Sequence, residues 1–66
     1  MRTFSCFIRD PRSSIPTLTF VFARDVGRAR ALARRQMAET RGALSVEICE
    51  NGALIAVELA GEGLAA

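Results

Sequence analysis

Apolar and polar residues alternate along two stretches near the start of the chain, and each stretch predicts a β-strand. Residues 3–8 place Phe4, Cys6 and Ile8 on one face. Residues 17–22 show the same period of two and are rich in β-branched and aromatic side chains, which favour strands. Between them, the turn-forming residues 10–14 predict a reversal of the chain.

After residue 24 the hydrophobic period changes to about 3.6 residues, which predicts an amphipathic helix. Asp25 is expected to be its N-cap, because a carboxylate there accepts from the unpaired amides of the first turn. Gly42 follows Arg41 as a candidate C′ glycine, so the helix is predicted to cover Val26 to Arg41. Gly27 is unfavourable in a helix, and close packing on the sheet would explain it.

Asn51 and Gly52 separate two apolar stretches and are the preferred pair for a two-residue type I′ hairpin turn. With Glu50 opposite Ala53, the regular register predicts apolar pairs on one face of the hairpin. These pairs are Ile48 with Ile55, Val46 with Val57, and Leu44 with Leu59.

These elements predict an α+β domain of β-β-α-β-β order, in which one helix packs on one face of a single four-stranded, antiparallel-rich sheet. The domain is expected to cover residues 1–59, with residues 60–66 as a frayed tail. The predicted core combines the larger apolar side chains of the strands with one stripe of the helix: Phe4, Cys6, Ile8, Leu18, Phe20, Phe22, Leu44, Val46, Ile48, Ile55, Val57 and Leu59 against Val26, Ala29, Leu32, Ala33 and Met37.

The opposite sheet face would then be uncovered, and it is expected to carry a patch suited to a second subunit, formed by Phe7, Val21, Cys49 and Leu54. Unpaired outer strands offer another route to association. A chain of 66 residues has a thin core that benefits from reinforcement, and a partner subunit is the reinforcement that this composition leaves.

Composition argues against several kinds of function. The chain has no His, Lys, Tyr or Trp, so the usual bases for activating a nucleophile are missing and no catalytic residue is predicted. Glu47 and Glu58 are expected to lie diagonally on the uncovered face as a solvated pair. Two cysteines without histidine do not make a common zinc set, and Cys6 and Cys49 fall on opposite faces. No metal, cofactor or small-molecule substrate is expected.

The longest apolar run, from Ala53 to Val57, is far too short to span a bilayer. The N-terminal residues are interrupted by charge before a secretory signal could form, so a cytoplasmic location is expected. All nine basic residues are arginines, and the net charge is +2. A helical wheel places Arg30, Arg34 and Arg41 along one flank, which makes them candidates for binding phosphates or other anions.

Residues 20–33 form a strand that leads into an Asp-capped, Ala-rich helix, and Val46-Glu47-Ile48 opens a hairpin further on. This arrangement resembles small uncharacterised bacterial proteins of β-β-α-β-β architecture. The resemblance covers most of the chain and implies that architecture, without an activity or site residues.

The sequence therefore favours a non-enzymatic binding or assembly domain that self-associates as a homodimer. The alternative is a nucleic-acid or anion-binding module that uses the arginine-rich helix.

Overall fold

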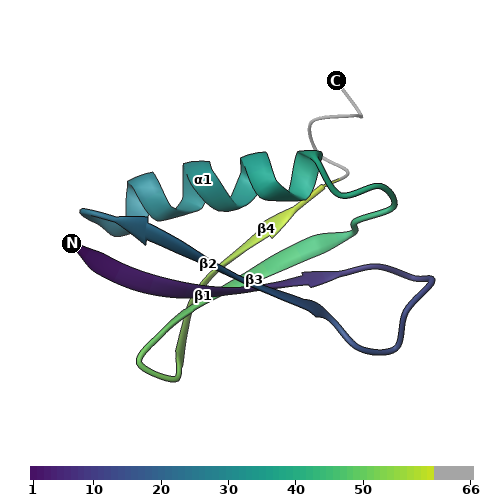
Figure 1. The fold of residues 1–66 in the computed structure, drawn as a ribbon, viewed down its shortest axis with the longest axis horizontal. Coiled ribbons are helices and arrows are strands. Elements are labelled where there is room, and N and C mark those ends of the chain that lie inside the picture. The colour runs from purple at the N-terminus through teal and green to yellow at the C-terminus, as the bar shows by residue number, and fades with distance from the viewer. Residues whose placement is uncertain (61–66) are drawn as a thin grey trace.

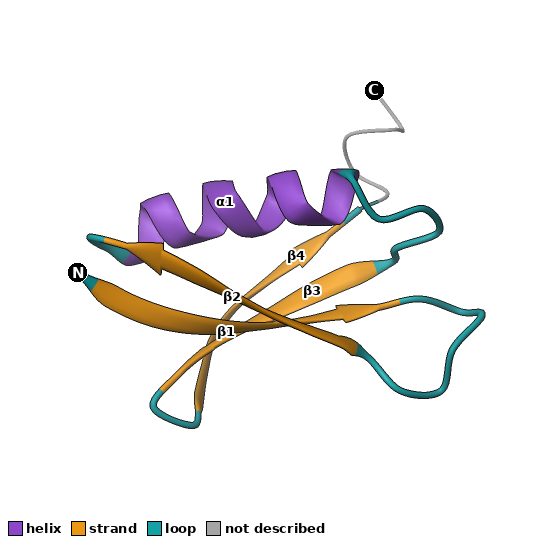
Figure 2. Ribbon diagram, in the orientation of Figure 1, coloured by secondary structure: helices purple, strands orange, loops and turns teal. Residues whose placement is uncertain are grey.

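The computed structural model describes residues 1–60 and contains four strands and one helix. In chain order these are β1 (Arg2–Arg9), β2 (Thr17–Ala23), α1 (Val26–Ala38), β3 (Ser45–Glu50) and β4 (Ala53–Leu59). The strands form one sheet in the order β2-β1-β3-β4, in which all neighbours are antiparallel. The helix α1 lies along one face of this sheet (Figures 1 and 2). The predicted α+β architecture is confirmed.

The core lies between α1 and the two central strands. From β1 it takes Phe4, Cys6 and Ile8, and from β3 it takes Val46 and Ile48. The pairing of Cys6 with Ile48 and of Ile8 with Val46 places these side chains on the same face. The buried positions predicted for both central strands, from alternation in β1 and from the hairpin pattern in β3, are therefore confirmed.

Asp25 caps α1 as predicted, because its carboxylate accepts a 2.8 Å hydrogen bond from the amide of Arg28. The predicted C-terminal boundary was wrong, since α1 ends at Ala38 with Glu39 as its C-cap. The hydroxyl of Thr40 donates to the carbonyl of Gln36, and the Thr40 amide bonds only three residues back, to Met37. These local bonds end the α-helix before Gly42, which has φ of 81° in the following loop.

The predicted sidedness of β2 was also wrong. Val21 pairs with Phe4 and is only 5% exposed, whereas Phe20 and Phe22 are 53% and 61% exposed. Leu18 is likewise half exposed. The helix approaches the sheet through Ala29 and Ala33, both fully buried, and the slim side chains on the helix-facing side of β2 fit beneath it. Because β2 carries apolar residues on both faces, alternation alone did not identify the buried one.

The hairpin turn forms as predicted, because Asn51 and Gly52 both have positive φ, 53° and 80°, as a type I′ turn requires. Cys49 pairs with Leu54, but Ile48 then pairs with Ala56, so a bulge at Ile55 shifts the register of β4 by one residue. The three predicted apolar pairs are therefore absent. Several side chains assigned to the core are exposed instead: Leu44, Val57 and Leu59, with Ile55 partly so.

Substituting alanine for two different glycines should change the free energy of unfolding in opposite directions. Gly52→Ala places a Cβ on a residue with φ of 80°, which should lower the free energy of unfolding by about 1–2 kcal/mol. Gly27→Ala should raise it by about 0.5 kcal/mol, because α1 gains a better helix former and the added Cβ meets only Asp25 Oδ1, at 3.4 Å. Close packing on the sheet does not explain Gly27. Chemical denaturation at one protein concentration tests both signs, and two changes of the same sign would contradict this account.

Candidate self-association surface

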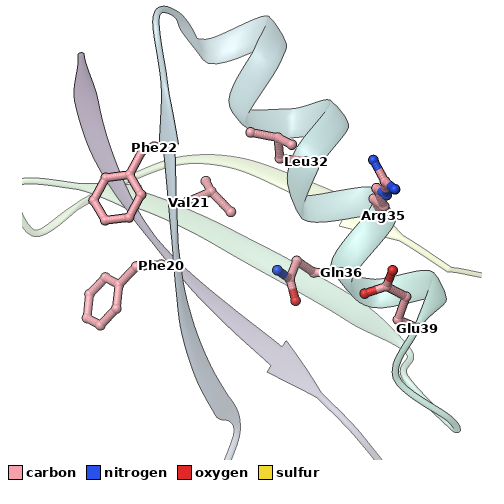
Figure 3. A pocket seen from close by; sticks show the side chains of 7 residues that line it. All are labelled: Phe20, Val21, Phe22, Leu32, Arg35, Gln36 and Glu39. Atoms are coloured by element: carbon pink, nitrogen blue, oxygen red, sulfur yellow. The ribbon is translucent and has the colours of Figure 1, made fainter.

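The sheet face opposite α1, here called the open face, carries two rows of large apolar side chains on its outer strands. One row comes from β2 and the other from β4. Their members are Leu18, Phe20 and Phe22 on β2, and Leu54, Val57 and Leu59 on β4, each between 47% and 61% exposed. Figure 3 shows Phe20 and Phe22 extending from β2 away from α1, while Val21 points toward the helix.

The central strands place smaller or polar side chains between these rows. One cross-strand ladder runs from Phe20 through Ser5 and Cys49 to Leu54. The next runs from Leu18 through Phe7 and Glu47 to Val57. The open face thus has apolar outer rows, and its middle is lined by Ser, Cys, Phe and Glu side chains.

Glu47 is the charged side chain in the middle of this face, and Arg9 neutralises it. Their closest N–O distance is 3.3 Å, from Arg9 Nη2 to Glu47 Oε1, and Arg9 Nε also donates to the carboxylate. Both residues lie on the open side of their strands. Covering this face would therefore bury a paired charge, which costs much less than burying a lone carboxylate.

The structure brings together three of the four residues predicted for self-association. Phe7, Cys49 and Leu54 lie on the open face, but Val21 belongs to the core. Phe20 and Phe22, the two largest side chains of this face, were predicted to lie in the core and so were not among the candidates. A charge-free strand with bulky residues on one side and slim ones on the other is the signal that could have identified them.

The two cysteines are free and lie in different environments. Cys6 is buried in the core, and this burial raises the pKa of its thiol. Cys49 is partly exposed on the open face. Cys6 pairs with Ile48, and the neighbouring pair is Ser5 with Cys49, so the two thiols point to opposite sides of the sheet, as predicted.

Two of the three candidate anion-binding arginines share a carboxylate partner. Arg30 Nε donates to Glu58 Oε2 at 2.5 Å, and Arg34 Nε lies 3.8 Å from Glu58 Oε1. Glu58 is only 8% exposed, so this carboxylate is held beneath the two guanidinium groups. Arg41 lies farther along, where its carbonyl accepts from Arg12 and its side chain lines a surface cleft with Arg34.

The expected pair of Glu47 and Glu58 on one face was wrong, because the bulge at Ile55 turns Glu58 toward α1 while Glu47 stays on the open face. Within residues 1–60, no three Cys, Asp or Glu side chains are grouped closely enough to hold a metal ion. No helix in the same part of the chain has the length and apolar character needed to cross a membrane.

Comparison of the chain with protein-family models, curated proteins and solved structures gave no match.

Two other ion pairs change carboxylate pKa values: Arg2 with Glu50, which are far apart in the sequence, and Arg12 with Asp10, which are neighbours in one loop. Arg2 donates to both oxygens of Glu50, at 2.8 and 2.7 Å, and these hydrogen bonds lower the pKa of Glu50 from its usual 4.5. Side-chain and backbone hydrogen bonds from Arg12 lower the pKa of Asp10 from its usual 3.8. Arg12 also donates to the carbonyl of Arg41 at 2.6 Å, which joins the loop after β1 to the loop after α1.

The lowered pKa values of Glu50 and Asp10 predict that the folded state loses stability in acid. A carboxylate whose folded pKa lies below its unfolded pKa stabilises the fold fully above the unfolded value, and this contribution is lost as pH falls through the folded value. Unfolding should therefore become easier below about pH 4.5, the usual pKa of Glu50. Glu50→Gln should be less stable than wild type at pH 7 and should decline less steeply in acid. Denaturant titrations at pH 7, 4.5 and 3 measure this, and an identical acid slope in both proteins would contradict it.

Proposed function

We propose that this protein is a small, non-enzymatic assembly domain that forms a homodimer by packing the open face of one copy against that of another. The observation that carries the proposal is the placement of the two outer rows: Leu18, Phe20, Phe22, Leu54, Val57 and Leu59 all lie on this face and are about half exposed.

The amount of apolar surface on the open face supports the binding of a partner. Half-exposed side chains of this size each leave on the order of 80–100 Å² accessible, so the six together leave roughly 500 Å². The largest contiguous apolar patch of a monomer is about 300–600 Å², and the two rows reach a similar sum although the central strands separate them. Including Phe7 and the small residues between the rows raises the area toward the roughly 800 Å² per partner of a standard interface.

A second copy suits this face because it brings the same apolar rows to the contact. Sheet faces that pack together bury their apolar side chains between them, and each copy offers two such rows. Arg9 and Glu47 neutralise each other within each copy, so the partner copy does not have to supply a charge when the two open faces pack together. A two-fold contact of this kind is the commonest way for identical chains to associate.

The arginine helix gives less support to the alternative of nucleic-acid or anion binding. Glu58 lies against both Arg30 and Arg34, so part of their charge is already neutralised. A phosphate would have to compete with a carboxylate that the fold holds in place. Self-association through the open face therefore remains the function that the contacts favour.

Leu54→Glu should weaken the dimer, because it introduces an unpaired charge into a surface that becomes buried. At micromolar concentration the wild type is expected to have at least twice the mass of one chain by light scattering, and Leu54→Glu should halve the measured mass. Ile15→Glu is the matched control, since Ile15 is 75% exposed in the loop between β1 and β2 and off the sheet. It should leave the mass unchanged.

The proposal fails if the wild type stays monomeric from micromolar to millimolar concentration, which would leave a different protein as the occupant of the open face. It also fails if Leu54→Glu and Ile15→Glu have the same mass as each other. Circular dichroism spectra of both variants should match that of the wild type, which checks that each variant is folded.

Cys49 provides a second measurement on the same face. Its alkylation by a maleimide should slow at least fivefold when the protein concentration rises from the monomer range to the dimer range, because the partner covers it. Buried Cys6, whose pKa is raised by burial, should stay unreactive at both concentrations and serves as the internal control. A rate for Cys49 that is independent of concentration would place the interface elsewhere.

A further inference from the structure

A cleft of about 600 Å³ lies where α1 ends, between the helix, the loop that follows it and the end of β4. Its apolar lining includes Met37 and Ala38 of α1, Leu44 just before β3, and Leu59 and Ala60 at the end of β4. Met37 belongs to the core and Ala60 packs against it, whereas Leu44 is 56% exposed. Because α1 stops at Ala38, the helix does not cover Leu44. The cleft is therefore a continuation of the core that residues 1–60 leave open.

Two arginines line this cleft, and they differ in their partners. Arg34 Nε lies 3.8 Å from Glu58 Oε1. The backbone carbonyl of Arg41 accepts a 2.6 Å hydrogen bond from Arg12, but within residues 1–60 the guanidinium of Arg41 makes no ion pair. A carboxylate that enters the cleft can therefore pair with Arg41 without displacing another acid.

The chain itself supplies an acidic and apolar segment next to the cleft. The predicted tail after Ala60 lies outside the described residues, and residues 61–66 read Gly-Glu-Gly-Leu-Ala-Ala. Glu62 is the charged side chain of this segment, and Leu64 is its large apolar one. Both lie an even number of positions after Ala60, so an extended backbone directs them to the side on which Ala60 meets the core.

The last described backbone contact directs the chain along the cleft. The amide of Ala60 donates to the carbonyl of Leu44 at 2.9 Å, which continues the antiparallel pairing of β4 with β3. The same direction leads past Ala43 and Gly42, which line the cleft. Leu64 follows Ala60 by four residues, a reach of at most about 14 Å. Because the segment is attached at the wall of the cleft, its effective concentration there is high.

We propose that residues 61–66, here called the strap, bind in this cleft of the same chain. Leu64 covers the exposed side of Leu44, and the carboxylate of Glu62 pairs with Arg41. Withdrawal of the two leucines from water stabilises the bound strap. The exposed ion pair contributes little affinity but fixes the register of the strap. This contact extends the core past the end of α1, and it does not depend on the homodimer.

Tryptophan fluorescence tests whether the strap is bound, because the chain contains no Trp or Tyr of its own. In Leu64→Trp, acrylamide should quench the emission about threefold less than in Ala65→Trp, because the indole at residue 64 is buried against the cleft. Ala65→Trp is the matched control, since an odd position of the extended strap faces solvent. Circular dichroism spectra of both variants should match that of the wild type.

Further changes in the Leu64→Trp protein test the two contacts. Leu44→Ser should raise the quenching about twofold, because it removes the apolar surface that the strap covers. Arg41→Glu should also raise it, and adding Glu62→Arg should restore the shielding, because opposite charges then face each other again. Arg35→Glu is the matched control and should leave the quenching unchanged, since it reverses a charge in the last turn of α1 that lines a different cleft.

Equal quenching of Leu64→Trp and Ala65→Trp overturns the proposal, and so does shielding that Leu44→Ser leaves unchanged. Loss of shielding on dilution also overturns it, because the cleft would then hold the strap of a second copy. An Arg41→Glu effect that Glu62→Arg does not reverse overturns the pairing of Glu62. Failure of the open-face proposal has a different signature, because it changes the mass of the particle and not the quenching at residue 64.

Discussion

The close approach of α1 to the sheet determines how the other side chains are distributed. The helix contacts the sheet through Ala29 and Ala33, which have no exposed surface. On the helix-facing side, β2 contributes the buried Val21 and Ala23, while the larger Phe4 comes from the neighbouring β1. The bulky residues of β2 project from the other side, and in β4 the bulge at Ile55 sets which residues do so.

The local elements could be predicted from the sequence, and the sidedness of the outer strands could not. The central strand β1, the Asp25 cap and the Asn51–Gly52 turn each depend on a short-range pattern, and all three were predicted correctly. β2 and β4 are apolar on both faces, so the choice of face depends on helix packing and, in β4, on one extra residue at Ile55. Alternation placed Phe7 and Cys49 of the central strands on the open face correctly, and Leu54 with them, while Val21 was exchanged for its neighbours Phe20 and Phe22.

The extra residue in β4 also determines on which face of the sheet the charged side chains of the predicted sites lie. It turned Glu58 toward α1, where it meets Arg30 and Arg34, and it left Glu47 with Arg9 on the other side. The two carboxylates predicted as a pair are therefore on opposite faces. Glu58 forms ion pairs with two arginines of α1, and Glu47 forms one with Arg9. Cross-strand register, which depends on hydrogen bonding between distant segments, controls which charges meet.

The position of β1 has a consequence for synthesis of the chain. β1 is made first but occupies the middle of the sheet, and its contact with β3 joins residues about forty positions apart, as in the pairing of Ser5 with Cys49. On the ribosome, the hairpin of β1 and β2 therefore emerges with apolar residues on both faces before its helix and third strand exist. Until β3 and α1 follow, the apolar side chains of this hairpin lack the elements that cover them in the folded domain.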